Sequence, residues 1–272
     1  SFSKNTQLAS LIRPNNSMKF LIYVICLIPI ILAFLIPVLF NLINIFSSYD
    51  VINFERLLNL TFNSFTVSLI ASVLILIVST FFLYNEKISK SKVYYYINQF
   101  ISLGYSIPGA VVALAVIISV TSLDNLDDNI KLLGSFSVYF LILIYAYIIR
   151  FMAVGKSPIK SSMEKYPDSY NSSAKNLGLS NFKIFQKIYF PINKYAFFTA
   201  LTLVFVDIMK ELPITLILRP FNFDTLATQT YEFAIEEMIP LSSIYSSVII
   251  IICCILLIFL KMFLDKSNVF RN

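Results

Sequence analysis

The stretch PDSYNSSAKNLGLSNFKIFQKIYFP, residues 167–191, is polar and basic and lies between two long apolar runs. Pro167 and Asp168 suit the first turn of a helix, where a missing N–H is tolerated and a carboxylate meets the positive helix end. The pattern predicts a short helix over 169–177. Gly178 then stands where a left-handed residue ends many helices.

A second helix is predicted after Ser180, whose hydroxyl can cap its first turn. Apolar side chains recur at spacings of three and four, at Phe182, Phe185, Ile188 and Tyr189. This spacing gives the helix one apolar face, while Lys183 and Lys187 project elsewhere. Pro191 opens the next apolar run. Two interpretations remain open: an amphipathic connector on the membrane surface, or a docking element for a cytoplasmic partner.

The composition indicates an integral membrane protein. Of 272 residues, 58% are hydrophobic and only 13% are charged, and the mean hydropathy is +0.79. A soluble domain has no place for so much apolar surface. The chain contains no histidine, so the commonest transition-metal ligand and general base are missing. Cys26, Cys253 and Cys254 lie in apolar runs without C-x-x-C spacing, which disfavours a zinc site or disulfide framework.

Six apolar segments are long enough to cross a membrane as helices, since about 20 residues suffice. They lie at 20–46, 64–84, 97–121, 135–154, 192–218 and 241–263. Continuous rather than alternating apolar runs exclude the strands of a membrane barrel. The sequence therefore predicts an all-α, polytopic bundle of six transmembrane helices. The six-span domain covers 20–265, between a polar lead-in or linker at 1–19 and a tail at 266–272.

The distribution of lysine and arginine orients the bundle. With the N-terminus inside, the cytoplasmic parts are 1–19, 85–96, 155–191 and 264–272. Together with the flanking Arg150, Lys194 and Lys261, they hold all but four of the 21 basic residues. The positive-inside rule then predicts that both termini and residues 167–191 are cytoplasmic. It also explains the pI near 9.1 without a nucleic-acid partner.

The spacing within this cytoplasmic loop, 155–191, resembles the integral subunits of type I ABC importers. Their pattern is E-A-A, three residues, G, nine residues, I-x-L-P. This chain has Ser172, Ser173, Ala174, then Gly178, then Ile188, Tyr189, Phe190 and Pro191. The resemblance implies that the first helix docks onto a separate ATPase dimer, which holds ATP and Mg and drives alternating access. Ala174 and Gly178 are expected to contact this ATPase. The chain departs from the pattern with Ser172 for Glu, Ser173 for Ala and Phe190 for Leu. Asp168, one turn earlier, is a candidate for the missing acidic role.

Two further stretches resemble the permeases of ferric iron importers, with thiamine and phosphonate permeases as relatives. They are LGYSIPGAVVALAV at 103–116 and FVDIMKELPITLILRPFNFDTLATQTYEFA at 205–234. The segment at 25–39 is similar to the start of the second half of such permeases. The resemblance implies a C-terminal six-span half in a bacterial inner membrane. It also implies a second half and a periplasmic or lipid-anchored binding protein that delivers ferric iron.

Two groups of residues are candidates for the translocation path or its gate. In the third run, Pro108 removes a backbone donor and Gly109 permits close approach, which predicts a kink or tight crossing. In the fifth run, polar residues precede a helix breaker, at Asp207, Lys210, Glu211 and Pro213. Asp207 and Glu211 would share a helical face, and Asp207 can pair with Lys210. Either the broken helix lines the path, or the span ends near residue 209 in a solvated outer end.

No residue set indicates catalysis, a cofactor or a metal site. The acidic group Asp124, Asp127 and Asp128 is interpreted as a solvated outer loop. A phosphate-binding G-x-x-x-x-G-K-[ST] motif does not occur, so ATP hydrolysis is expected on a separate subunit. One alternative is the same machine for another cargo, thiamine or a phosphonate. A secondary transporter or channel is the other. It should carry intramembrane ionisable residues and internal repeats, and spans one to four contain almost no such residues.

Overall fold

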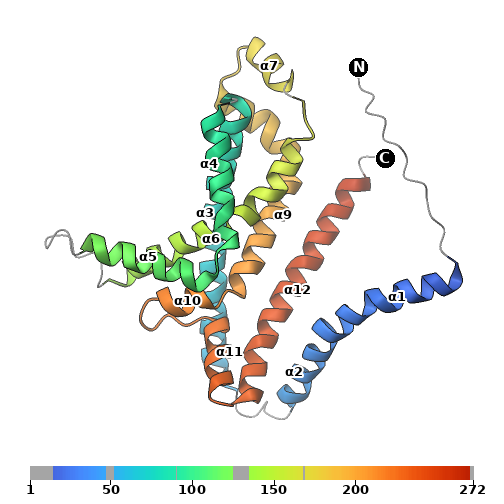
Figure 1. The fold of residues 1–272 in the computed structure, drawn as a ribbon, viewed down its shortest axis with the longest axis vertical. Coiled ribbons are helices and arrows are strands. Elements are labelled where there is room, and N and C mark those ends of the chain that lie inside the picture. The colour runs from blue at the N-terminus through green and yellow to red at the C-terminus, as the bar shows by residue number, and fades with distance from the viewer. Residues whose placement is uncertain (1–14, 47–51, 90, 125–134, 168, 270–272) are drawn as a thin grey trace.

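The computed structural model describes residues 15–46, 52–89, 91–124, 135–167 and 169–269, and the elements in these ranges are all helical (Figure 1). Within the described ranges five helices are long and apolar enough to cross a membrane, and one bent pair gives a sixth candidate when it is counted as one span. The five are Asn16–Phe46, Phe54–Ser89, Phe136–Met163, Asn181–Met209 and Ile239–Asp265. The predicted all-α bundle is thereby confirmed, with one span that is not straight.

Three long helices form the centre of the bundle: α3 (Phe54–Ser89), α6 (Phe136–Met163) and α9 (Phe190–Met209), each packed against the other two. The inward face of α3 carries a stripe of small buried residues, Ser64, Ser68, Ala71, Ser72 and Ser79. Gly155 of α6 lies opposite, where an added Cβ would come 2.8 Å from Cγ2 of Ile75. Small residues let the backbones approach closely, which is how membrane helices gain packing contacts without a hydrophobic driving force.

The third span is broken at Pro108. It consists of α4 (Lys92–Ser102), the 3-10 turn η3 (Leu103–Ser106) and α5 (Gly109–Asp124). The two parts meet at 114°, so α5 crosses the bundle while α4 runs along α3 (Figure 1). The kink predicted at this proline is confirmed. The predicted bounds, 97–121, are too narrow, because the bent pair runs from Lys92 to Asp124.

The fifth predicted span, 192–218, is wrong at both ends. α9 stops at Met209, and α10 (Pro213–Leu218) begins at the proline, which cannot continue a helix but readily starts one. At the other end, α8 (Asn181–Ile184) and the π-helical turn η4 (Phe185–Tyr189) run directly into α9. The amide of Phe190 donates five residues back to Phe185. This wider turn precedes Pro191, whose nitrogen offers no hydrogen bond, so the helix passes through the proline.

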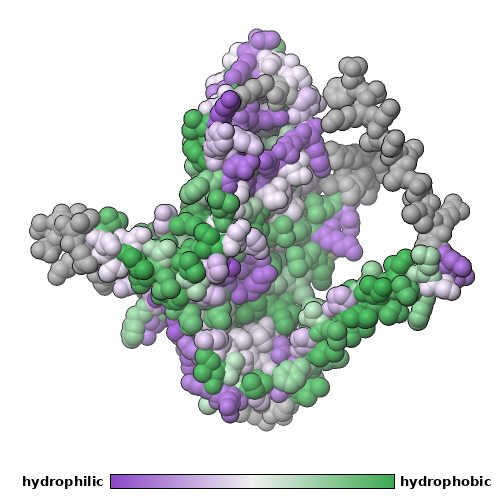
Figure 2. All heavy atoms as spheres, in the orientation of Figure 1, coloured by the Kyte–Doolittle hydropathy of each residue, from purple (hydrophilic) through white to green (hydrophobic). Residues whose placement is uncertain are grey.

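α12 (Ile239–Val269) lies outside the central three helices. It packs against α9, α11 (Leu226–Ile235) and α2 (Ile36–Phe46). The amide of Asn41 in α2 donates to the hydroxyl of Ser246 over 3.2 Å. The first span continues from α2 through the π-helical turn η1 (Ile31–Leu35) into α1 (Asn16–Ile30), which extends away from the bundle (Figure 1). No residue of α1 is buried. Its surface is strongly hydrophobic, whereas hydrophilic residues gather around α7 (Ser169–Asn176; Figure 2). In a membrane, lipid or another protein must cover α1.

Candidate functional site

The segment over 169–191, called the coupling segment below, contains α7, a glycine turn, α8 and η4. α7 ends in a Schellman motif, since the Gly178 amide donates to Lys175 over 2.9 Å and the Leu179 amide to Ala174 over 3.1 Å. Gly178 has φ +76°, and the Ser180 hydroxyl accepts from the Lys183 amide at 3.5 Å. The predicted helix, left-handed glycine and second cap are therefore confirmed.

Ala174 faces the bundle rather than its surroundings. It is 3% exposed and belongs to an apolar cluster with Leu83, Ile159, Met163 and Ile184. These residues come from α3, α6 and α8, so Ala174 holds α7 to the ends of two central helices. The expectation that Ala174 contacts a partner directly does not fit this burial. Ser172, Ser173 and Gly178 are exposed, and Leu177 is 81% exposed.

The second half of the coupling segment is attached to α3 through Tyr84. Its hydroxyl donates to the Asn181 carbonyl over 2.5 Å, and its ring lies 5.1 Å from Phe185 and 5.3 Å from Tyr189. Tyr189 is buried and Ile188 partly buried, as the predicted apolar face requires. Phe182 departs from that face, because it is 72% exposed.

The last two residues of the pattern lie at the surface. Phe190 and Pro191 are exposed. Asp168, the candidate acidic residue, lies outside the described residues. The coupling segment is thus anchored through its apolar side and presents α7 at one end of the molecule (Figure 1).

A second cluster joins the break in the third span to the break in the fifth. We call Ile107, Gly109, Arg150 and Glu211 the junction. The Arg150 guanidinium donates through Nη1 to the Ile107 carbonyl over 2.7 Å. Its Nε lies 3.5 Å from Oε2 of Glu211. That second contact is an ion pair without hydrogen-bond geometry, since Nε has no hydrogen-bond partner in the described structure.

Glu211 is 8% exposed and fixes the start of α10. Its Oε1 accepts from the Ile214 amide over 3.3 Å, and its carbonyl accepts from the Thr215 hydroxyl over 2.7 Å. Gly109 lies directly beside it: an added Cβ would come 2.6 Å from Oε1 of Glu211, so a larger residue would displace this carboxylate. The start of α5, at Pro108 and Gly109, therefore lies beside Glu211 and the start of α10 at Pro213. Their role in a translocation path stays a prediction.

Asp207 and Glu211 do not share a face, because α9 ends between them at Met209. Asp207 instead pairs with Lys210 over 2.8 Å, as the spacing predicted. The ammonium end is solvent-accessible, with the Lys210 side chain 62% exposed. The span does end near 209, but its last residues are not simply a solvated end, since Glu211 is buried.

Two basic residues of α6 were assigned by sequence to the cytoplasmic end of the fourth span or to the loop after it. α6 continues to Met163, so Arg150 lies near its middle and Lys156 in its second half. Lys156 is 6% exposed and donates to the Asn98 carbonyl and the Ser102 hydroxyl in the last turn of α4. Both cations thus donate to backbone carbonyls near the break, and the Asn98 carbonyl also accepts from the Ser102 hydroxyl over 2.8 Å. A carbonyl left without a donor is costly inside a membrane. The sequence signal that could have indicated this role is the presence of these cations close to an apolar run.

The stretch after the break is tied together by polar contacts. The guanidinium of Arg219 contacts Asp224 and also Glu232, the latter over 2.8 Å. The hydroxyl of Ser64 in α3 accepts from the Leu226 amide over 2.8 Å, which attaches the start of α11 to the central bundle. In the described ranges, no three His, Cys, Asp or Glu residues gather as metal ligands would. Asp124 ends α5, while Asp127 and Asp128 lie outside those ranges.

A bundle with broken spans and an anchored helix–glycine–helix segment at one end defines a type I ABC importer permease, a transport component rather than an enzyme. The sequence model of the family "Binding-protein-dependent transport system inner membrane component" matches residues 87–268. The chain belongs to this family.

The chain is 24% identical over 215 residues to the "Fe(3+)-transport system permease protein FbpB 2" of Haemophilus influenzae (strain ATCC 51907 / DSM 11121 / KW20 / Rd). The match covers 79% of this chain and 40% of that relative, so the chain spans about two fifths of its length.

Two solved structures share the fold. One is a bacterial alginate ABC transporter in complex with a periplasmic protein that holds an alginate pentasaccharide. Its matching chain has TM-score 0.70 at 13% identity, over 90% of this chain and 93% of that chain. The other is a bacterial ABC transporter that imports the acidic polysaccharide alginate, with TM-score 0.59 at 13% identity, over 92% and 96%.

Proposed function

We propose that this chain is one permease half of an ATP-driven importer that moves ferric iron into the cytoplasm. A binding protein delivers the iron, and a separate ATPase dimer supplies the energy through the coupling segment. The observation that carries the proposal is the coupling segment itself: α7 is held by buried Ala174, while its far side is exposed. Membership of the permease family and the likeness to a ferric iron permease support it.

The proposed arrangement in the membrane follows from the charges. The coupling segment and both termini face the cytoplasm, where most lysines and arginines lie. Arg150 no longer counts toward this asymmetry, because it lies inside α6. A second half, on the same polypeptide or another copy, completes the path. The apolar and unburied α1 is available to pack against it.

The proposed mechanism is alternating access between two packings of the two halves, biased by ATP and by the loaded binding protein. The junction is the proposed gate, because Arg150 joins both broken spans, through a hydrogen bond to the Ile107 carbonyl and an ion pair with Glu211. Each break leaves a short helix, α5 or α10, that contacts the other. A movement of one is therefore transmitted to the other.

Contact between α7 and the ATPase can be tested by crosslinking. In a background with Cys26, Cys253 and Cys254 replaced by alanine, Leu177→Cys is expected to crosslink to cysteines introduced on the ATPase surface. Ala174→Cys is the matched control and is expected to react several-fold less, because Ala174 is 3% exposed. Equal crosslinking at both positions would contradict the burial. Absence of a crosslink at 177 in an ATP-hydrolysing complex would contradict the docking.

The cargo can be tested by uptake into vesicles that contain both permease halves, the ATPase and the binding protein. Radiolabelled ferric iron is expected to accumulate only with ATP, and unlabelled ferric iron should compete. Excess thiamine or phosphonate should leave uptake unchanged. Competition by thiamine or a phosphonate, without ferric iron uptake, would assign the chain to another cargo of the same machine. Uptake that needs an ion gradient but no ATP would indicate a secondary transporter.

A further inference from the structure

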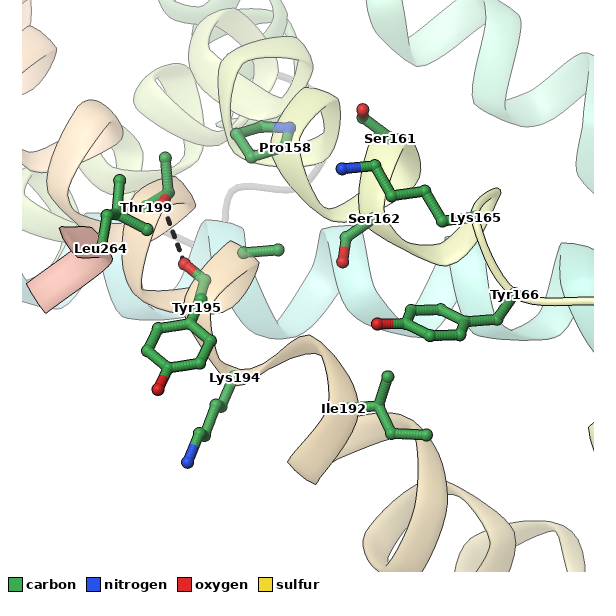
Figure 3. A pocket seen from close by; sticks show the side chains of 11 residues that line it. Pro158, Ser161, Ser162, Lys165, Tyr166, Ile192, Lys194, Tyr195, Thr199 and Leu264 are labelled. Atoms are coloured by element: carbon green, nitrogen blue, oxygen red, sulfur yellow. Dashed lines mark hydrogen bonds between the residues drawn. The ribbon is translucent and has the colours of Figure 1, made fainter. Parts of the chain in front are cut away.

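A cavity of about 580 Å³ lies between the last turns of α6, the first turns of α9 and the end of α12 (Figure 3). It is at the same end of the bundle as α7 but is separate from the coupling segment's apolar cluster. Its lining is half polar and half apolar. The family resemblance and the proposed transport path assign it no role.

The polar half is basic and rich in hydroxyl groups. Lys165 reaches over the space, and the hydroxyls of Ser162 and Tyr166 point into it from the same side (Figure 3). Lys194 lies at the rim, with its ammonium 5.2 Å from the Tyr195 ring. None of the described lining residues is acidic. The described ion pairs include neither lysine. Two cations with neighbouring hydroxyl donors suit a phosphate group.

The apolar part of the lining is formed by Pro158, Ile192, Ala196 and Leu264. Along α6 the sequence passes from the apolar run at 135–154 to a segment with three lysines, 155–165. The cavity therefore lies where the bundle leaves hydrocarbon for headgroups, and both parts of an amphipathic ligand find matching surroundings.

We propose that this cavity binds an anionic phospholipid of the phosphatidylglycerol class. Its phosphate lies against Lys165, Ser162 and Tyr166, with Lys194 at the rim, and an acyl chain lies along Ile192 and Leu264. Free phosphate would use only the polar half and leave the apolar wall uncovered. A bound lipid would add a link between the end of α12 and α6 beside the coupling segment, where α12 otherwise contacts α9 through Phe263 and Tyr195. The site requires neither the ATPase nor the cargo.

The test measures lipid retained by the full-length permease in mixed phosphatidylglycerol and phosphatidylcholine nanodiscs, followed by native mass spectrometry after detergent extraction. The variant Lys165→Gln/Lys194→Gln is expected to retain roughly 30-fold less phosphatidylglycerol, from the attraction that each lysine supplies at a membrane surface. Lys183→Gln/Lys187→Gln is the matched control. It removes the same charge from exposed lysines outside the cavity and is expected to change retention less than about twofold.

Tyr166→Phe gives a second measurement that removes one donor without changing the ring. It is expected to lower retention a few-fold, roughly as the loss of one hydrogen bond to a charged group would. This milder change keeps the proposal testable should the double variant not fold. Unchanged retention in both variants would overturn it, as would an equal loss in the control. Equal retention of phosphatidylcholine would remove the anionic requirement. Displacement of the lipid by millimolar inorganic phosphate would assign the site to free phosphate.

Discussion

Removing either charge of the Arg150–Glu211 pair is expected to destabilise the folded permease by about 3–5 kcal/mol. Arg150→Met leaves Glu211, 8% exposed, without its cation and leaves the Ile107 carbonyl without its donor. Glu211→Leu leaves the guanidinium without a counter-charge and frees the Ile214 amide at the start of α10. An uncompensated charge is costly in the low-dielectric interior of a membrane protein, which is why the single changes are severe.

The double variant, Arg150→Met with Glu211→Leu, is expected to recover a large part of this loss, because no buried charge remains. SDS titration of the purified permease measures the free energy of unfolding of all three variants. Lys160→Met is the control. Its ion pair with Glu164, at the end of the same helix, has both side chains exposed, so its loss should cost no more than about 1 kcal/mol. Additive losses in the double variant would show that the two charges do not act as a pair.

The local features of the coupling segment were predictable because short-range chemistry decides them. A glycine after a helical octet, a serine two residues later and apolar residues at spacings of three and four specify α7, the turn and α8 without reference to the rest of the chain. The burial of Ala174 was not predictable from the sequence. Which side of α7 faces the bundle depends on Leu83 of α3 and Met163 of α6, which are distant in sequence.

The junction shows the limit of hydropathy more clearly. Arg150 was interpreted as the cytoplasmic flank of a span because a charge usually ends an apolar run. Its helix continues for more than three turns beyond Arg150. The guanidinium is accommodated there because it contacts the Glu211 carboxylate and the Ile107 carbonyl, which belong to the two broken spans. Pro108 and Pro213 predict those breaks individually. That the breaks meet, with Glu211 between them, is a tertiary fact that no local pattern contains.

The breaks and the basic residues of α6 have one physical explanation. A helix interrupted inside a membrane exposes carbonyl groups that water cannot reach. In the third span, Lys156 binds the Asn98 carbonyl and Arg150 binds that of Ile107. The two cations of α6 therefore donate to the backbone of the broken third span, as amides of an unbroken helix would. Their two attachments, six residues apart on one helix, hold the turn at a defined angle.

Gly104→Ala is expected to prevent the third span from packing against α6. A Cβ at this position would lie 2.1 Å from the backbone oxygen of Ile149 and 3.1 Å from its carbonyl carbon. Backbone cannot rotate aside as a side chain can, so the two elements must separate and the neighbouring junction must open. Overpacking of an ordinary core costs about 1–3 kcal/mol, and we expect this change to reach or exceed the upper value.

The matched control is Gly178→Ala, which adds the same methyl group where no atom lies within 4 Å. It should cost only the backbone penalty of a left-handed alanine, about 1–2 kcal/mol, and should leave the central bundle intact. Thermal unfolding of the detergent-solubilised permease, followed by loss of the monodisperse peak in size-exclusion chromatography, compares the two. A Gly104→Ala variant as stable as Gly178→Ala would show that η3 and α6 are not in backbone contact, and the junction would lose the support that fixes Arg150 beneath Ile107.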